Sequence, residues 1–215
     1  MSNELKTNLE NWVSSLQDVR LPGVFNPWSD WNPDDLPDDG PSARADRLLR
    51  HLLHPSPRYL LVGEAIGHLG AKVSGIAFTS ERLLYEGAVP RLHRQLQRRI
   101  TERDRPYSEP SATIVWRTAY RLGIADDLLL WNAFPWHPHG PSPNSNRPPL
   151  SDELALGFNY VESLVSFYDD LTVIAVGKHA SRSLEVAGIP AQSVRHPSMG
   201  GSIEFADQLS SITSR

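Results

Sequence analysis

Three apolar runs of seven residues each stand out in this chain of 215 residues. They cover residues 59–65, 128–134 and 171–177, and a shorter fourth run covers residues 192–197. Apolar runs of this length predict buried β-strands. Between the runs, apolar residues recur at the spacing of a helix, so we expect helices there. Strands that alternate with helices indicate a mostly parallel sheet.

Seven segments carry apolar residues at helical spacing. They cover roughly residues 3–19, 42–54, 79–87, 111–122, 151–168, 178–187 and 201–213. Ser42 is the expected N-cap of the second helix. The sequence therefore predicts an α/β fold, a three-layer α/β/α sandwich around a central, mostly parallel four-stranded sheet. We expect residues 42–215 to form this domain and residues 1–41 to form a helix followed by an acidic, proline-rich arm.

The composition excludes several classes of protein. Hydrophobic residues make up 40% of the chain, which allows a sizeable core, and the chain contains no cysteine. Disulfides, thiol catalysis and cysteine-ligated metal clusters are therefore excluded. No apolar run approaches the roughly 20 residues of a membrane helix, and the N-terminus lacks the pattern of a secretory signal. We expect a cytoplasmic monomer without a membrane partner.

The net charge of −4 conceals an uneven distribution. Residues 1–40 hold eight acidic and two basic residues, whereas residues 41–150 hold fifteen basic and nine acidic residues. Residues 151–215 are acidic again. An acidic chain can present a basic face, so the net charge does not exclude a nucleic-acid partner.

Polar residues follow three of the predicted strands. They are Gly-Glu-Ala-Ile-Gly-His at 63–68, Asn-Ala-Phe at 132–134 and His-Pro-Ser at 196–198. In an open α/β sheet, ligands bind outside the carboxyl ends of the strands. We expect these three segments to converge on one site. His93, His137 and His139 suggest zinc, but no third ligand stands at the required spacing, so we expect no metal.

Three longer motifs contain these segments: GEAIGHLGAKVSGIAFTSERLL at 63–84, LLLWNAFPWHP at 128–138 and VRHPSMGG at 194–201. Together, and in this order, they resemble the uracil-DNA glycosylase superfamily. In its best-known branch Gly-Gln-Asp-Pro-Tyr-His is followed by Gly-Leu-Ala-Phe-Ser, and His68 and Phe78 fall in register with that pattern. The start GEAIG is more similar to the branches that carry an iron–sulfur cluster, but this chain has none of their cysteines.

The resemblance implies a monofunctional DNA glycosylase of base excision repair. Such an enzyme flips a damaged base out of DNA into a pocket and hydrolyses its N-glycosidic bond. For this chain the resemblance implies deoxyuridine in DNA as the substrate, uracil and an abasic site as the products, and no cofactor.

Three residues are the candidates for handling the base. Phe78 would stack on its face, and the amide of Asn132 matches the N3–H and O4 of uracil. His196 would stabilise the negative charge on the leaving base and is a candidate catalytic residue. The structural alternatives are a core phenylalanine, an asparagine that closes a turn and a loop histidine bonded to the backbone.

The loop from Gly63 to His68 would complete the pocket, and it departs from the best-known branch at two positions. Ala65 stands where that branch has the aspartate that orients water, so Glu64 is the second candidate catalytic residue, with loop capping as its alternative role. Gly67 stands where that branch has a tyrosine that blocks the methyl group of thymine. His68 is a candidate for contact with phosphate or water.

The candidate contacts to DNA lie on loops. Ser198 would order its loop or bind phosphate, Met199 would insert into the base stack, and Gly200 would allow close approach of the backbone. Arg147 would reach a phosphate. The six arginines of residues 91–105 form either a phosphate-contacting stretch or a solvated helix face.

Other functions remain open at this point. Gly67 leaves room for other deaminated bases such as hypoxanthine or xanthine, and Ala65 suggests a non-catalytic protein that binds uracil or abasic DNA. A protein that binds free nucleotides is a further class, but the loop GEAIGHLG has neither the lysine of a P-loop nor the glycine spacing of a dinucleotide site.

Overall fold

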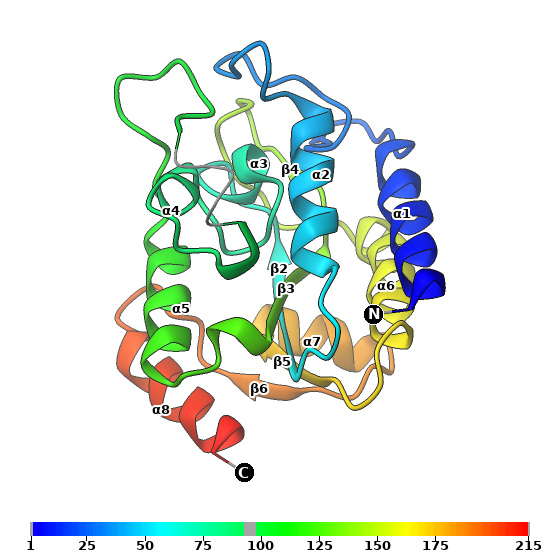
Figure 1. Ribbon diagram of the computed structural model, residues 1–215, viewed down its shortest axis with the longest axis vertical. Coiled ribbons are helices and arrows are strands. Elements are labelled where there is room, and N and C mark those ends of the chain that lie inside the picture. The colour runs from blue at the N-terminus through cyan, green and yellow to red at the C-terminus, as the bar shows by residue number, and fades with distance from the viewer. Residues whose placement is uncertain (1, 93–97, 215) are drawn as a thin grey trace.

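The computed structural model describes residues 2–92 and 98–214. Within these residues a sheet of four parallel strands has the order β3-β2-β5-β6 (Figure 1). The strands are β2 (Tyr59–Ala65), β3 (Leu128–Phe134), β5 (Thr172–Val176) and β6 (Gln192–Val194). The α/β fold predicted from the sequence is confirmed.

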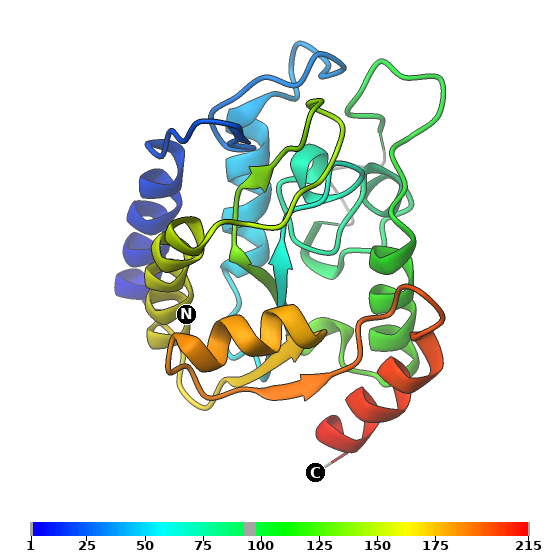
Figure 2. The same ribbon diagram turned by 180° about the vertical axis from the view of Figure 1, so that it is seen from behind.

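Helices cover both faces of the sheet (Figures 1 and 2). One face packs on α4 (Glu81–Tyr85), α5 (Pro110–Arg121) and α8 (Ser202–Thr213). The other packs on α1 (Asn3–Gln17), α2 (Pro41–Leu52), α6 (Ser151–Ser166) and α7 (Lys178–Val186). None of the described helices has the length and apolar character needed to cross a membrane.

The strands β2, β3 and β5 are mostly apolar because both of their faces are buried, whereas Gln192 and Ser193 of β6 are exposed. In β2, Tyr59 and Leu61 belong to the core on the side of α5 and α8, whereas Leu60 and Val62 belong to the core on the opposite side. Alternate residues of a strand point to opposite faces, so one short run contributes to both cores.

Several boundaries differ from the sequence prediction. The second helix begins with Pro41 and has Gly40 rather than Ser42 at its N-cap, because proline without an N–H fits the first helical position. The fourth strand ends at Val194, since the N–H of Arg195 donates to Gln208 Oε1 at 2.6 Å instead of continuing the sheet.

Five short elements were not predicted from the sequence. They are α3 (Ala71–Ser74), the 3₁₀ helices η1 (Pro90–Leu92) and η2 (Ala125–Asp127), and a small antiparallel pair of β1 (Val24–Phe25) with β4 (His137–Pro138). None of these elements exceeds four residues, which is too short to show a periodic pattern.

The N-terminal segment is part of the core. Trp12 of α1 packs against Trp131 of β3 with ring centroids 4.8 Å apart, and Trp28 stacks on the same indole at 5.8 Å. Trp31 instead lies largely on the surface. The division of the chain at residue 41 stays a prediction, and the segments on its two sides share one core.

Buried ion pairs hold the acidic arm onto α2. The guanidinium of Arg44 is fully buried, pairs with Asp35 at 2.8 Å and donates to the backbone oxygens of Pro27 and Asp30. One turn further along α2, Arg47 pairs with the buried carboxylate of Asp39. The arm therefore follows a defined path over the body.

The pair of Arg44 and Asp35 should contribute strongly to stability. Asp35→Ala leaves a buried guanidinium without its carboxylate, and we expect the free energy of unfolding to fall by about 3–5 kcal/mol. Asp38→Ala removes an exposed carboxylate that pairs with Arg98, and it should cost no more than about 1 kcal/mol. Urea denaturation of both variants measures the difference, and equal losses would contradict this account of the arm.

Candidate functional site

The carboxyl ends of the parallel strands open into one cavity of about 480 Å³. Gly63 of β2 pairs in register with Asn132 of β3, and the segment after β6 brings His196 to the same place. Ten of the twelve residues predicted from the sequence to form the site line this cavity: Gly63, Glu64, Ala65, Gly67, His68, Phe78, Asn132, Arg147, His196 and Ser198. The expected convergence of three strand ends is therefore present.

The floor of the cavity requires glycine at position 63, which has no side chain. A Cβ at this position would lie 2.5 Å from Oδ1 of Asn132 and 2.8 Å from Cζ of Phe78. Both distances are shorter than side chains tolerate, so only glycine lets the amide and the ring approach the same point of the backbone. The amide of Asn132 has no hydrogen-bond partner within the described residues and lines the cavity.

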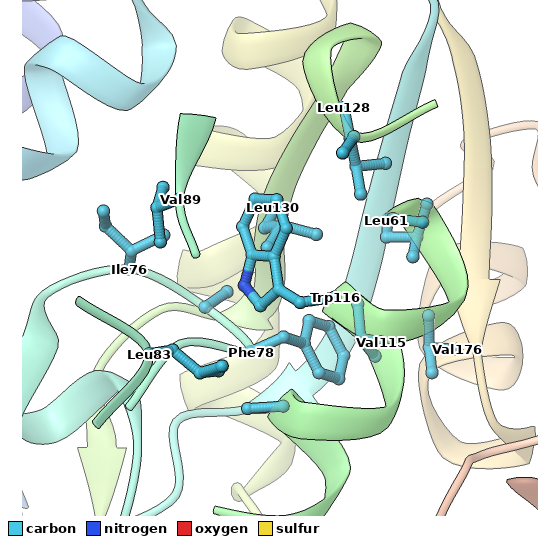
Figure 3. Packing of buried hydrophobic residues seen from close by; sticks show 14 of the residues in the cluster. Leu61, Ile76, Phe78, Leu83, Val89, Val115, Trp116, Leu128, Leu130 and Val176 are labelled. Atoms are coloured by element: carbon cyan, nitrogen blue, oxygen red, sulfur yellow. The ribbon is translucent and has the colours of Figure 1, made fainter. Parts of the chain in front are cut away.

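Phe78 lies between the cavity and the core. Its ring belongs to the apolar cluster that includes Val115 and Trp116 of α5 (Figure 3), and it also lines the cavity. Its backbone has a φ of 48°, a left-handed conformation that costs energy for a bulky residue. The hydroxyl of Ser74 holds this turn, because it donates to the carbonyl oxygen of Thr79 and accepts from the N–H of Ile76.

His196 has a defined tautomer. The backbone N–H of Ser198 donates to its Nδ1 at 3.2 Å, and the hydroxyl of Ser198 lies 2.7 Å from the same atom. Because a backbone N–H can only donate, Nδ1 accepts, and Nε2 carries the proton of the neutral ring. Burial lowers the pKa of His196, and Arg195 lowers it further. The ring is therefore a neutral hydrogen-bond donor.

The segment of residues 137–147, which follows β3, holds the motif loop of residues 63–68 in place. Oδ1 of Asn146 accepts from the backbone N–H of His68 at 3.1 Å and lies 3.0 Å from its Nδ1. The buried ammonium of Lys72 donates to the carbonyl oxygen of Pro143 and to Oδ1 of Asn144. Nδ1 of His137 bonds the carbonyl oxygen of Ile66 at 2.9 Å. His137 thus supports the motif loop.

The described residues include no cluster of three or more histidine, cysteine, aspartate or glutamate side chains that could hold a metal. Two carboxylates line the cavity, at Glu64 and Glu109. Glu64 is partly exposed, and its Oε1 lies 3.8 Å from Nδ1 of His179. Ala65, beside it, offers no group for proton transfer.

Glu109 was missed in the sequence because it lies in a loop without a recognisable motif. It is the N-cap residue of α5, and its Oε1 accepts from the hydroxyl of Ser111 at 2.6 Å. Burial raises the pKa of its carboxyl group, and the bond from Ser111 opposes that shift.

The predicted contacts to DNA lie at the rim. Met199 is 92% exposed with a φ of 53°, and Met199 and Gly200 lie beside the cavity rather than in its wall. Arg147 lines the cavity, but both of its terminal nitrogens bond the carboxylate of Glu153 at 2.6 and 2.7 Å. Contact with phosphate stays a prediction for Arg147, whose charge is already compensated.

Several arginines of the stretch from residue 91 to residue 105 form hydrogen bonds or ion pairs within the protein. Arg91 donates to the backbone oxygens of His51, Asp126 and Leu128. Arg98 pairs with Asp38 and Asp39, and Arg99 pairs with the buried carboxylate of Glu81. His93 and Arg94 lie outside the described residues. These contacts favour a structural role for the described arginines that form them.

Comparison with known proteins agrees with this geometry. The family model of the uracil DNA glycosylase superfamily matches residues 51–206. The fold is similar to the crystal structure of wild-type Pedobacter heparinus SMUG2, with a TM-score of 0.68 over 98% of this chain and 97% of that chain. The two sequences are 13% identical, so this likeness shows the fold alone. None of the curated proteins compared with the chain matches it.

The support of the motif loop by His137 should depend on pH. Burial lowers the pKa of His137 from 6.5 to about 4. The unfolded chain therefore binds a proton in this range that the folded chain does not, and stability falls as the pH drops from about 6.5 towards 4. We expect His137→Asn to reduce this acid-dependent loss by about 3 kcal/mol. Urea denaturation at pH 7 and pH 4 measures it, and the exposed-site variant His179→Asn should leave the loss unchanged.

Proposed function

The chain belongs to the uracil-DNA glycosylase superfamily, and on this premise we propose that it removes uracil from DNA by hydrolysis of the N-glycosidic bond. Members of this superfamily are DNA glycosylases for damaged bases, so the reaction class follows from the family, and the identity of the base is our proposal. The observation that carries the proposal is the convergence of Phe78, the unpaired amide of Asn132 and neutral His196 on one cavity.

The amide of Asn132 supports the choice of uracil. Uracil presents a donor at N3 and an acceptor at O4, and a fixed carboxamide can satisfy both with two hydrogen bonds. Cytosine presents the reverse pattern. Phe78 supplies a stacking face, worth about 1–3 kcal/mol for each stacked base.

His196 supports the cleavage step. When the bond between C1′ and N1 breaks, the electron pair stays on the base and negative charge develops on O2. The N–H at Nε2 of His196 would donate to this oxygen, and a neutral donor of this kind stabilises charge that appears only in the transition state. Water adds to C1′ and loses a proton, and the uracil anion takes up a proton at N1, so that the products are uracil and an abasic site.

Glu64 is our candidate for orienting the water, because Ala65 cannot do so and Glu64 lines the cavity. The exposed amine of Lys178 also lies in the wall. We propose that water rather than this amine attacks C1′, which makes the enzyme monofunctional. Strand cleavage without added alkali would contradict that assignment.

Incubation with a labelled oligonucleotide that contains one uracil, followed by alkali, tests the function. Strand cleavage at the uracil is the expected result in single-stranded or double-stranded DNA. Tight binding without cleavage would instead favour a non-catalytic binding protein. Parallel substrates with hypoxanthine and xanthine test the wider specificity, because nothing lies within 4 Å of the position of a Cβ on Gly67.

The roles of His196 and Asn132 predict large effects on cleavage of uracil. His196→Ala should lower kcat by about 10²–10³-fold, as expected for the loss of one donor to the developing anion. Asn132→Ala removes two hydrogen bonds and should lower kcat/KM roughly 10- to 100-fold. Glu162→Gln on the exposed face of α6 is the control and should keep full activity. Full activity in both site variants would refute the site but not the reaction.

A further inference from the structure

One wall of the cavity has no side chain from the motif loop. Gly67 lines this wall, and a Cβ there would meet no atom within 4 Å. The turn that follows is closed by a bond from the N–H of Gly70 to the carbonyl oxygen of Gly67 at 3.3 Å. The backbone alone therefore forms this part of the wall, and another element must set the shape of the pocket beside it.

Glu109, the N-cap residue of α5, lines the same cavity. A Cβ on Gly70 would lie 1.7 Å from Oε2 of Glu109 and 2.9 Å from its Cδ, so the carboxylate occupies the space of a side chain at position 70. Any other residue at position 70 would displace it. Glycine at position 70 thus leaves room for an acid from a different element, and this acid lines the same cavity as Gly67.

The carboxylate is held in one orientation. Oε1 accepts from the hydroxyl of Ser111 at 2.6 Å, whereas Oε2 has no hydrogen-bond partner within the described residues. Burial raises the pKa of this group, which agrees with an incompletely solvated carboxyl in a cavity wall.

The edges of the base decide what this group can face. In the proposed function, Asn132 takes the N3 and O4 edge, and His196 takes O2. The edge that remains is C5–C6, and the parts of the cavity wall left to receive it include Gly67 and Glu109. Uracil carries only hydrogen at C5, which leaves space for a water molecule that solvates Oε2. A methyl group at C5 would displace that water and bury the carboxylate against an apolar group, which is costly.

We propose that Glu109 is a specificity-determining residue that excludes thymine from the pocket through its carboxylate. The proposal rests on the proposed function, because it assumes that a uracil-sized base is bound by Asn132 and His196. The discrimination between uracil and thymine would be electrostatic rather than steric, because glycine at position 67 has no side chain that could clash with the methyl group of thymine.

The test compares two substrates that differ by the C5 methyl group alone. Wild-type protein, Glu109→Ala and Glu109→Gln are assayed on duplexes with one U·G or one T·G pair, and kcat/KM is measured for each. We expect Glu109→Ala to lower the preference for uracil over thymine roughly tenfold or more, by raising cleavage of T·G. Glu109→Gln keeps the size but not the charge and should lower the same preference.

The control variant is Asp152→Asn, which removes an exposed acid from the first turn of α6 and should leave the preference unchanged. If Glu109→Ala does not fold, the isosteric Glu109→Gln decides. An unchanged preference in a variant that still cleaves uracil overturns the role of Glu109, as does an equal fall on both substrates. A wild-type protein that does not cleave uracil overturns the proposed function itself.

Discussion

The site depends on one close approach, between the backbone of β2 at Gly63 and the side chains of Asn132 and Phe78. The parallel register of β2 with β3 sets Gly63 opposite Asn132, and the absence of a Cβ lets the amide and the ring share the floor of the cavity. Phe78 accepts a left-handed backbone to reach this point, and its ring is held by the core beneath it. Strain at the site is thus offset by burial next to it.

The uneven distribution of charge along the chain stabilises the fold, which counts of charged residues in each segment do not show. The acidic arm and the basic middle of the chain are the two halves of an internal network, in which Arg44, Arg47 and Arg98 pair with aspartates of the arm. Much of the basic excess is therefore neutralised within the molecule. Two cations that line the cavity, Lys178 and Arg195, come from the acidic last third of the chain.

Support for the motif loop comes from residues that are distant in sequence. Asn146 and His137 come from the segment that follows β3 and bond the loop, and Lys72 fixes the part of this segment next to Asn146. His137 could be considered in the sequence only as a metal ligand, because its actual partner is a backbone oxygen 71 residues away. Hydrogen bonds of this kind leave no periodic pattern in the sequence.

The sequence by itself determined the layered fold and the residues of the strand ends, because apolar runs and glycine positions are local signals that follow from burial and backbone geometry. The resemblance of the motifs to the superfamily added Phe78, Asn132 and His196 as candidates, and all three line the cavity. Only the tertiary structure decided which charges are free and which groups meet. Arg147 is paired with Glu153, and Glu109 enters the cavity from α5 over Gly70. These outcomes depend on contacts between distant segments, and such contacts exist only after the chain has folded.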